Sequence, residues 1–205
     1  HLASNVLIGA PRNDGEAGLS VGVVSANEGG GASTLATAFA ITCAEDCGLR
    51  TTLIDADTRR RTVSSAFGLN GSPGLAELTS GDAEHNQCIQ QQSNPLLSLV
   101  SSSSELSQRR LSASPRMMSA AVDHFQAEQD IVIVDLPSAD RPDHALHLAK
   151  HLDYLVLIVE SDKSEQQHIR HILRQFGSDR PTIGVVLTKQ KSYLPGLFQR
   201  AITPS

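Results

Sequence analysis

The sequence contains no tryptophan, and aromatic residues make up only 3% of its 205 residues. A hydrophobic core must therefore be built mainly from valine, isoleucine, leucine and alanine. Long apolar runs are also missing: no stretch approaches the roughly 18 residues that a membrane-spanning helix requires. The length suits one domain that is large enough to bury a core.

An excess of positive charge is absent as well. Lys and Arg together number 17 against 22 Asp and Glu, which gives a formal net charge of −5 and argues against a nucleic-acid partner. The cysteines, Cys43, Cys47 and Cys88, show no C-x-x-C spacing that would favour a metal site. We expect all of them to be buried as small hydrophobic residues.

Apolar runs alternate with helical patterns along the chain, which predicts strands separated by helices. The expected strands are Leu19–Ser25, Thr51–Asp55, Leu96–Ser101, Ile131–Val134, Tyr154–Val159 and Thr182–Leu187. The expected helices are Ser33–Asp46, Pro115–Glu128, Arg141–His151 and Ser164–Phe176. This order indicates an α/β fold, with a doubly wound, mostly parallel sheet and helices on both faces. The Ser/Gln/Asn-rich segment from Gly71 to Ser114 is expected to form flexible loops.

A glycine-rich loop, Gly29–Gly31, follows the first predicted strand and precedes a predicted helix. The amides at the start of such a helix and its dipole favour an anion, so the loop is a candidate phosphate site. Ser33 and Thr34 take the places of the loop hydroxyls, the first of which would ligate Mg²⁺. The lysine that normally precedes these hydroxyls is missing, because position 32 is alanine, Ala32.

Carboxylates follow two further strands. Asp55 and Asp57 stand two residues apart, so on an extended chain they project to the same side and could hold a hydrated Mg²⁺. Asp135 ends the apolar segment Ile131–Val134 and has the form of a Walker B aspartate. Open α/β sheets bind ligands at the carboxyl ends of their strands, so the loop and the carboxylates together predict one nucleotide site.

These combined motifs resemble those of the bacterial tyrosine kinases (BY-kinases), in the MinD/ParA branch of P-loop NTPases. The family's loop SAxPGEGKST is matched by SANEGGGAST at residues 25–34, with Ala32 in place of lysine. Further family segments are DxDxR at residues 55–59, FGL at 67–69, PGL at 73–75, SPRM at 114–117 and DxP at 135–137. The resemblance covers almost the whole chain and implies the P-loop fold.

The same resemblance implies ATP or ADP with Mg²⁺ as ligands and assigns roles to particular residues. The catalytic residues are Asp55, Asp57 and Asp135, and the metal ligands are Ser33, Asp55 and Asp135. The nucleotide-binding residues are Gly29, Gly30, Gly31, Ala32, Ser33, Thr34, Arg59, Thr188 and Lys189. Tyr193 is the candidate phospho-acceptor in the tail.

Residues 5–11 (NVLIGAP) resemble the segment that follows the family's oligomerisation helix. This implies that residues 1–205 form a single kinase domain from a longer protein, whose upstream membrane part or oligomerisation helix is missing. The implied role is in exopolysaccharide or capsule biosynthesis and export. The implied partner is a polysaccharide co-polymerase membrane protein or an N-terminal membrane part of the same chain. Assembly into a homo-oligomer and a place in the cytoplasm, at the inner face of the bacterial inner membrane, follow from the same resemblance.

Several departures from the family pattern bear on activity. Ala32 removes the charge that contacts the β- and γ-phosphates, and loss of one such group costs about 3–4 kcal/mol in the transition state. Glu28 adds negative charge near the expected phosphates, Thr188 and Lys189 replace a base-contacting asparagine, and the tail lacks a tyrosine cluster. Together they favour a kinase-like regulatory domain, a pseudokinase, with impaired or absent phosphotransfer.

Two alternatives stay open. The first is an active ATP-dependent tyrosine autokinase in which engineering changed the Walker A lysine to alanine. The second is a MinD/ParA-like ATPase, which the missing signature lysine and the FGL and PGL segments disfavour.

Clustered histidines on predicted helices suit a solvated polar face better than a zinc site; they are His144, His147, His151, His168 and His171.

Overall fold

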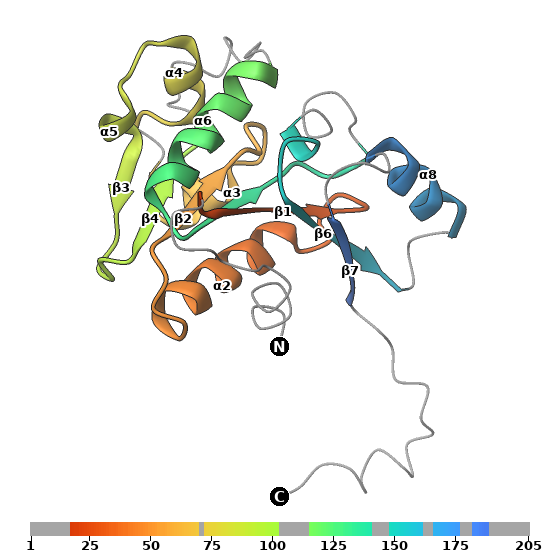
Figure 1. The fold of residues 1–205 in the computed structure, drawn as a ribbon. Coiled ribbons are helices and arrows are strands. Elements are labelled where there is room, and N and C mark those ends of the chain that lie inside the picture. Colours follow the sequence, from red (N-terminus) through yellow and green to blue (C-terminus); the bar gives the residue numbers. More distant parts are fainter. Residues whose placement is uncertain are drawn as a thin grey trace, which may run out of the picture.

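The computed structural model describes residues 17–69, 72–102, 115–140, 148–161, 166–176 and 182–188. A seven-stranded sheet runs through the molecule in the order β3-β4-β2-β5-β1-β6-β7 (Figure 1). All neighbouring strands pair in parallel except β3 and β4, which pair antiparallel. The strands are β1 (Leu19–Ser25), β2 (Thr51–Asp55), β3 (Ile89–Gln91), β4 (Leu97–Val100), β5 (Ile131–Asp135), β6 (Tyr154–Glu160) and β7 (Thr182–Thr188).

Helices cover both faces of this sheet. Helix α2 lies on one face, and α6 lies on the other together with α4 (Figure 1). The helices are α2 (Ala32–Glu45), α3 (Thr62–Ala66), α4 (Leu75–Ser80), α5 (His85–Cys88), α6 (Pro115–Glu128) and α8 (Gln166–Phe176). The predicted doubly wound, mostly parallel α/β fold is therefore confirmed.

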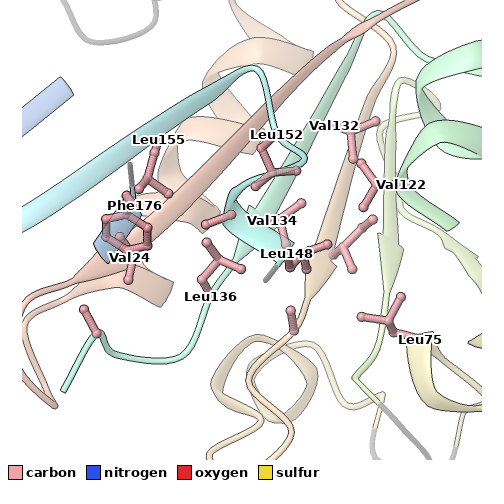
Figure 2. Packing of buried hydrophobic residues seen from close by; sticks show 14 of the residues in the cluster. Val24, Leu75, Val122, Val132, Val134, Leu136, Leu148, Leu152, Leu155 and Phe176 are labelled. Atoms are coloured by element: carbon pink, nitrogen blue, oxygen red, sulfur yellow. The ribbon is translucent and has the colours of Figure 1, made fainter. Parts of the chain in front are cut away.

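The central strand β5 shows why the predicted strands are apolar at every position. Ile131 and Ile133 belong to the core under α2, whereas Val132 and Val134 belong to the core under α6 and α8. Figure 2 shows the second of these cores, with Val132 drawn beside Val122 of α6 and Val134 beside Leu148. Successive strand side chains point to opposite faces, so a strand covered on both sides needs apolar residues throughout.

Two expectations require correction. The strand predicted at Leu96–Ser101 is confirmed as β4, but residues 72–91, which are expected to form flexible loops, contain α4, α5 and β3. The sequence does not give the bounds of α4, α5 and β3, because these elements are only three to six residues long, too short for a periodic signal. Cys43 and Cys88 are buried as expected, but Cys47 is exposed in the turn after α2.

The remaining elements differ from expectation by a few residues at their ends, for example β5, which extends through Asp135. Of the helix expected at Arg141–His151, only the last four residues lie among those that the structure describes. None of the helices within the described part of the chain is long and apolar enough to cross a membrane.

Strand pairing brings the predicted site residues to one edge of the sheet. β1, β2 and β5 are parallel neighbours, so their carboxyl ends meet at the same edge. Asp135 of β5 is in register with Val23 of β1 on one side and with Asp55 of β2 on the other. The glycine loop and both strand-end aspartates therefore lie at neighbouring strand ends.

Candidate functional site

The glycine loop has a backbone conformation that its glycines alone permit without strain. Gly29 and Gly31 have φ angles of 77° and 97°, in the left-handed region that L side chains rarely adopt. A Cβ atom on Gly30 would lie 2.7 Å from the Cβ atom of Ser25. Gly31 is the N-cap of α2 and accepts the first helical hydrogen bond, from the amide of Leu35 at 3.0 Å.

A pocket of about 170 Å³ opens against this loop. Its walls come from the loop and the start of α2, from the segment after β2 and from the segment after β5. The lining residues are Ser25, Gly29, Gly30, Gly31, Ala32, Ser33, Thr34, Asp57, Arg60, Thr62, Leu136 and Ser138. A helix N-terminus that opens into a pocket through a glycine loop presents backbone amides and a positive dipole end to an anion.

The charges at this pocket differ from those that the family pattern predicts. Ala32 is the first residue of α2 and lines the pocket with a methyl group where a lysine is expected. Arg60 is the cationic residue among the described lining residues, and its Nε lies 3.7 Å from Oε1 of Glu28. Both side chains are more than 40% exposed, so this ion pair is weak and Arg60 can reorient towards an anion.

Asp55 is engaged by its own chain. Its Oδ2 accepts hydrogen bonds from the amide and the hydroxyl of Ser64, at 2.8 and 2.7 Å, and its Oδ1 accepts one from the amide of Asp57 at 3.1 Å. Burial raises the pKa of Asp55, although the hydrogen bonds from Ser64 oppose that rise. Asp55 does not appear among the described residues that line the pocket, and its contacts tie α3 to the end of β2.

Asp135 is equally buried, but neither of its carboxyl oxygens has a hydrogen-bond partner among the described residues. Burial raises the pKa of Asp135 to about 8; the Ser33 hydroxyl opposes this rise, whereas Asp55 adds to it. Ser33 thus faces Asp135, but the contact lacks hydrogen-bond geometry. A buried carboxyl group without a partner is costly, and a bound cation would remove that cost.

Asp57 organises the segment between β2 and α3. Its Oδ1 accepts hydrogen bonds from the amides of Arg59 and Arg60, at 3.1 and 3.0 Å. Asp57 is also one of the residues that line the pocket, so the residue whose carboxylate shapes the turn borders the ligand space. The carboxyl groups of Asp57 and Asp135 and the hydroxyl of Ser33 lie near the candidate phosphate site, and together they form an oxygen donor set of the kind that Mg²⁺ prefers.

The structure places the predicted site residues in three groups. The glycines, Ala32, Ser33, Thr34 and Asp57 line the pocket, and Asp55 and Asp135 lie beside it at the strand ends. Arg59 is exposed and Thr188 ends the edge strand β7; neither is found among the described lining residues. Lys189 and Tyr193 lie outside the described residues.

Sequence reasoning missed several residues of the site. Arg60 lines the pocket in place of its neighbour Arg59, and nothing in the spacing of a three-arginine run distinguishes the two. It also missed Ser25, Thr62, Leu136 and Ser138. Ser25 and Leu136 lie within quoted motifs, at residues 25–34 and 135–137, but sequence reasoning gave them no role.

The histidine clusters predicted on the helices lie only partly within the described chain. His168 lies 3.3 Å from the carbonyl oxygen of Ala26, and His171 lies 2.8 Å from the side-chain nitrogen of Gln175. His151 is exposed, and His144 and His147 fall outside the described residues. The structure instead brings together His85, His124 and Glu128.

A family model described as ATPase MipZ matches residues 21–161, which include the glycine loop and all three aspartates. The chain belongs to this ATPase family. The homologues of this chain are bacterial tyrosine kinases. The tyrosine-protein kinase CpsD of Streptococcus agalactiae is 27% identical over 169 residues, which cover 82% of this chain and 73% of that protein. EpsB of Ralstonia solanacearum is 28% identical over 129 residues, which cover 62% of this chain and 17% of that protein.

Solved structures confirm the MinD/ParA-like P-loop fold of this MipZ-family chain. The chimerical protein CapA2B2 has a TM-score of 0.77 at 22% identity, over 92% of this chain and 82% of that chain. The septum site-determining protein MinD of Pyrococcus horikoshii, complexed with Mg-ADP, has a TM-score of 0.69 at 16% identity, over 82% of this chain and 69% of that chain. At these identities the likeness concerns the fold.

Proposed function

We propose that this chain is a tyrosine-kinase-like domain with a nucleotide site, which regulates exopolysaccharide or capsule biosynthesis and export with impaired or absent phosphotransfer. One observation carries the proposal: the glycine cradle is formed and open, while its first helical residue is Ala32. The site has kept the backbone that binds phosphate and lacks the cation that assists transfer.

The residues present fit Mg²⁺ with ADP or ATP. Backbone amides of the glycine loop and the start of α2 would bind the phosphates, and the hydroxyl of Ser33 and the carboxylate of Asp135 would hold the metal. A bound Mg²⁺ would neutralise phosphate charge in this family of reactions. Asp57 would orient metal-bound water, whereas Asp55 holds the shape of the turn that carries Asp57.

Phosphotransfer is expected to be weak because its catalysis depends on positioned positive charge. The methyl group of Ala32 supplies none, and Glu28 adds negative charge near the same loop. Arg60 supplies one cation at the pocket, but it starts from the segment after β2 and not from the helix that holds the loop. It can therefore contribute to binding without restoring the geometry of the missing lysine.

The proposed partner is a polysaccharide co-polymerase membrane protein, or a membrane part of the same chain, at the inner face of the bacterial inner membrane. The match to CpsD supports a tyrosine-kinase relationship. The match to only 17% of EpsB supports the occurrence of such a domain within a much longer protein. Docking to that partner, and contact between copies of this chain, would be the means of regulation.

The test is a calorimetric titration of the protein and of Ala32→Lys with Mg-ADP, paired with an autophosphorylation assay with Mg-ATP. We expect weak binding by the unchanged protein, at least about tenfold tighter binding by Ala32→Lys, and no detectable transfer without the lysine. Rapid tyrosine phosphorylation by the unchanged protein would contradict impaired phosphotransfer, and absence of binding in both proteins would contradict the nucleotide site.

A control variant shows whether binding uses the glycine loop. Gly30→Ala places a Cβ atom 2.7 Å from that of Ser25, so the cradle must distort while the helix and strand that flank it remain. Mg-ADP binding should be lost in Gly30→Ala with a circular dichroism spectrum that matches the unchanged protein. Unaltered binding would place the nucleotide elsewhere.

The second candidate function, a MinD/ParA-like ATPase, is favoured by the match to ATPase MipZ over residues 21–161. The two candidates differ in the fate of the γ-phosphate in Ala32→Lys. Phosphate transferred to a tyrosine of the protein supports the kinase, whereas phosphate released into solution without protein labelling supports the ATPase.

A further inference from the structure

The side chains of His85, His124 and Glu128 converge at the surface of α5 and α6. Their ligand atoms all lie within 4.8 Å of one another, and none of the three residues lines the nucleotide pocket. We propose that they form a binding site for a transition metal ion of the Zn²⁺ type, separate from the Mg²⁺ nucleotide site.

Two of the ligands come from one helix. His124 and Glu128 are four residues apart on α6, so they lie on the same helix face, with His124 Nε2 3.8 Å from Glu128 Oε1. Both side chains are 53% exposed, so each can change rotamer without disturbing the core. An i, i+4 pair of this kind can supply two ligands to one metal ion, as the two histidines of a helical H-E-x-x-H motif do.

The third ligand comes from a different element and is held in place. The ring of His85, the first residue of α5, lies edge-on to the ring of His124 at a centroid distance of 3.8 Å. Its other neighbour is Phe125, at a centroid distance of 4.1 Å, which packs the imidazole against the body of α6. Within the described chain, the Nε2 atom of His85 is buried and has no hydrogen-bond partner.

The donor set selects the class of metal. Two imidazole nitrogens and one carboxylate oxygen suit Zn²⁺, with ligand distances of about 2.0–2.2 Å and a water molecule as fourth ligand. Mg²⁺ and Ca²⁺ prefer sites made of oxygen alone, so they would compete poorly here. The ligand atoms lie up to 4.8 Å apart, so the exposed side chains of His124 and Glu128 would move closer together around an ion.

A metal at this position would connect two parts of the molecule. α5 leads directly into β3, the antiparallel edge strand, whereas α6 covers the central strands of the sheet. Because β3 pairs with β4 through only three residues, a bridge from His85 to α6 would hold the edge of the sheet against the helical layer. The site would therefore act on the stability of the β3 edge.

The experiment measures metal binding directly, on tag-free protein in excess Mg²⁺ so that the oxygen site is occupied. All proteins carry Cys47→Ser, because Cys47 is an exposed thiol that binds transition metals on its own. Zn²⁺ affinity is measured by competition with a chromogenic chelator, and the coordination is followed through the visible absorption of Co²⁺. The variants are His124→Gln and Glu128→Gln, and the control is His171→Gln, another exposed helical histidine with a polar side chain four residues on.

We expect one tight equivalent of metal and a tetrahedral Co²⁺ spectrum for the parent protein and for His171→Gln. Loss of a group that only orients a ligand already costs 10–100-fold in affinity, so loss of a ligand should cost at least about tenfold. Equal affinities in all four proteins, or no tetrahedral Co²⁺ absorption in the parent, would overturn the proposal. Because nucleotide is absent throughout, this outcome is independent of the proposed kinase-like function.

Discussion

Asp55 and Asp135 stand side by side at the ends of neighbouring strands, and both are completely buried. They have the same chemistry and almost the same depth, but their surroundings differ. Asp55 accepts three hydrogen bonds from the segment that follows it, whereas Asp135 has no partner among the described residues. The carboxyl group of Asp55 therefore stabilises the fold, whereas the oxygen atoms of Asp135 are available to a ligand.

The difference in hydrogen-bond partners gives Asp55 and Asp135 separate roles, although the family motifs assign both of them to metal binding. Burial and charge alone would make both residues candidates for metal binding. The hydrogen bonds show that displacing Asp55 towards a metal would break its contacts with Ser64 and Asp57. Asp135 gains from a cation without losing a contact, because an unpartnered buried carboxyl group is already unfavourable. We therefore expect Asp135 to respond to Mg²⁺ and Asp55 to support the fold.

The largest expected effect is on stability and follows from the Asp55 contacts. Asp55→Ala leaves the Ser64 amide, the Ser64 hydroxyl and the Asp57 amide without their acceptor, which should cost about 3 kcal/mol or more. Asp135→Ala strands no hydrogen-bonding group and should cost less than about 1 kcal/mol. Urea unfolding at pH 6, without Mg²⁺ or nucleotide, measures the loss in free energy of unfolding for each variant. Equal losses would contradict the different roles given to the two aspartates.

The next effect concerns pH. The pKa of Asp135 is raised from 3.8 to about 8 by burial, so between these values the folded protein holds a proton that the unfolded chain has released. Stability from this group is therefore complete below about pH 4 and is lost as the pH rises towards 8. Asp135→Asn cannot ionise at position 135 and so does not lose this stability. The free energy of unfolding of Asp135→Asn minus that of the parent should therefore increase by at least about 1 kcal/mol from pH 5 to pH 8.

Denaturant unfolding over a series of pH values, in chelator and without nucleotide, checks this expectation. The raised pKa of Asp55 acts in the same direction, but it is present in both proteins and largely cancels in the difference. A constant difference between parent and Asp135→Asn across the series would mean that Asp135 ionises normally in the folded protein.

A smaller change tests the Asp55 network from its other side. Ser64→Ala removes the 2.7 Å hydrogen bond to Asp55 and the acceptor of a 3.2 Å bond from the amide of Ser102, which should cost about 1–2 kcal/mol. Ser65, next in α3, is exposed and does not contact Asp55 through any of the hydrogen bonds of that carboxylate, so Ser65→Ala is the comparison variant and should cost less than Ser64→Ala. Similar losses in both would assign the effect to the helix and not to Asp55.

The smallest effect concerns nucleotide binding by the two adjacent arginines. Arg60 lines the pocket and Arg59 does not appear among its described lining residues, so Arg60→Gln should weaken Mg-ADP binding about fivefold, or about 1 kcal/mol. Arg59→Gln should leave the affinity unchanged within about twofold, since an exposed charge outside the site is screened by solvent. Calorimetry at fixed ionic strength gives both values, and the opposite order would favour the residue that the family motif names.

Much of the fold was predictable because its signals are local. The strand Leu19–Ser25 and the strand beginning at Thr51 have the predicted bounds, since continuous Val, Ile and Leu runs are typical of strands buried on both faces. Short elements such as α5 and β3 were not predictable, because three or four residues cannot show a period. The antiparallel pairing of β3 with β4 depends on which strands are neighbours in the folded sheet, and no local sequence pattern predicts it.

The candidate site divides in the same way. The glycine loop could be inferred from its residues, and Gly29 and Gly31 adopt the positive φ angles that only glycine accepts easily. The pocket-facing role of Arg60 depends on how the turn after β2 is held by Asp57, which is a matter of hydrogen bonds and not of spacing. The cluster of His85 with His124 joins residues 39 positions apart (124 minus 85), and nothing in the sequence links them.

The sequence by itself determined the alternating β/α architecture, the glycine turn and the absence of a cation at position 32, because these depend on side-chain size, backbone freedom and composition. Only the tertiary structure decided which buried carboxyl group is satisfied and which is open to a ligand. The physical reason is that the free energy of a buried polar group depends on the partners within about 3 Å of it. Those partners are brought there by packing, through residues such as Ser64 that lie outside every motif.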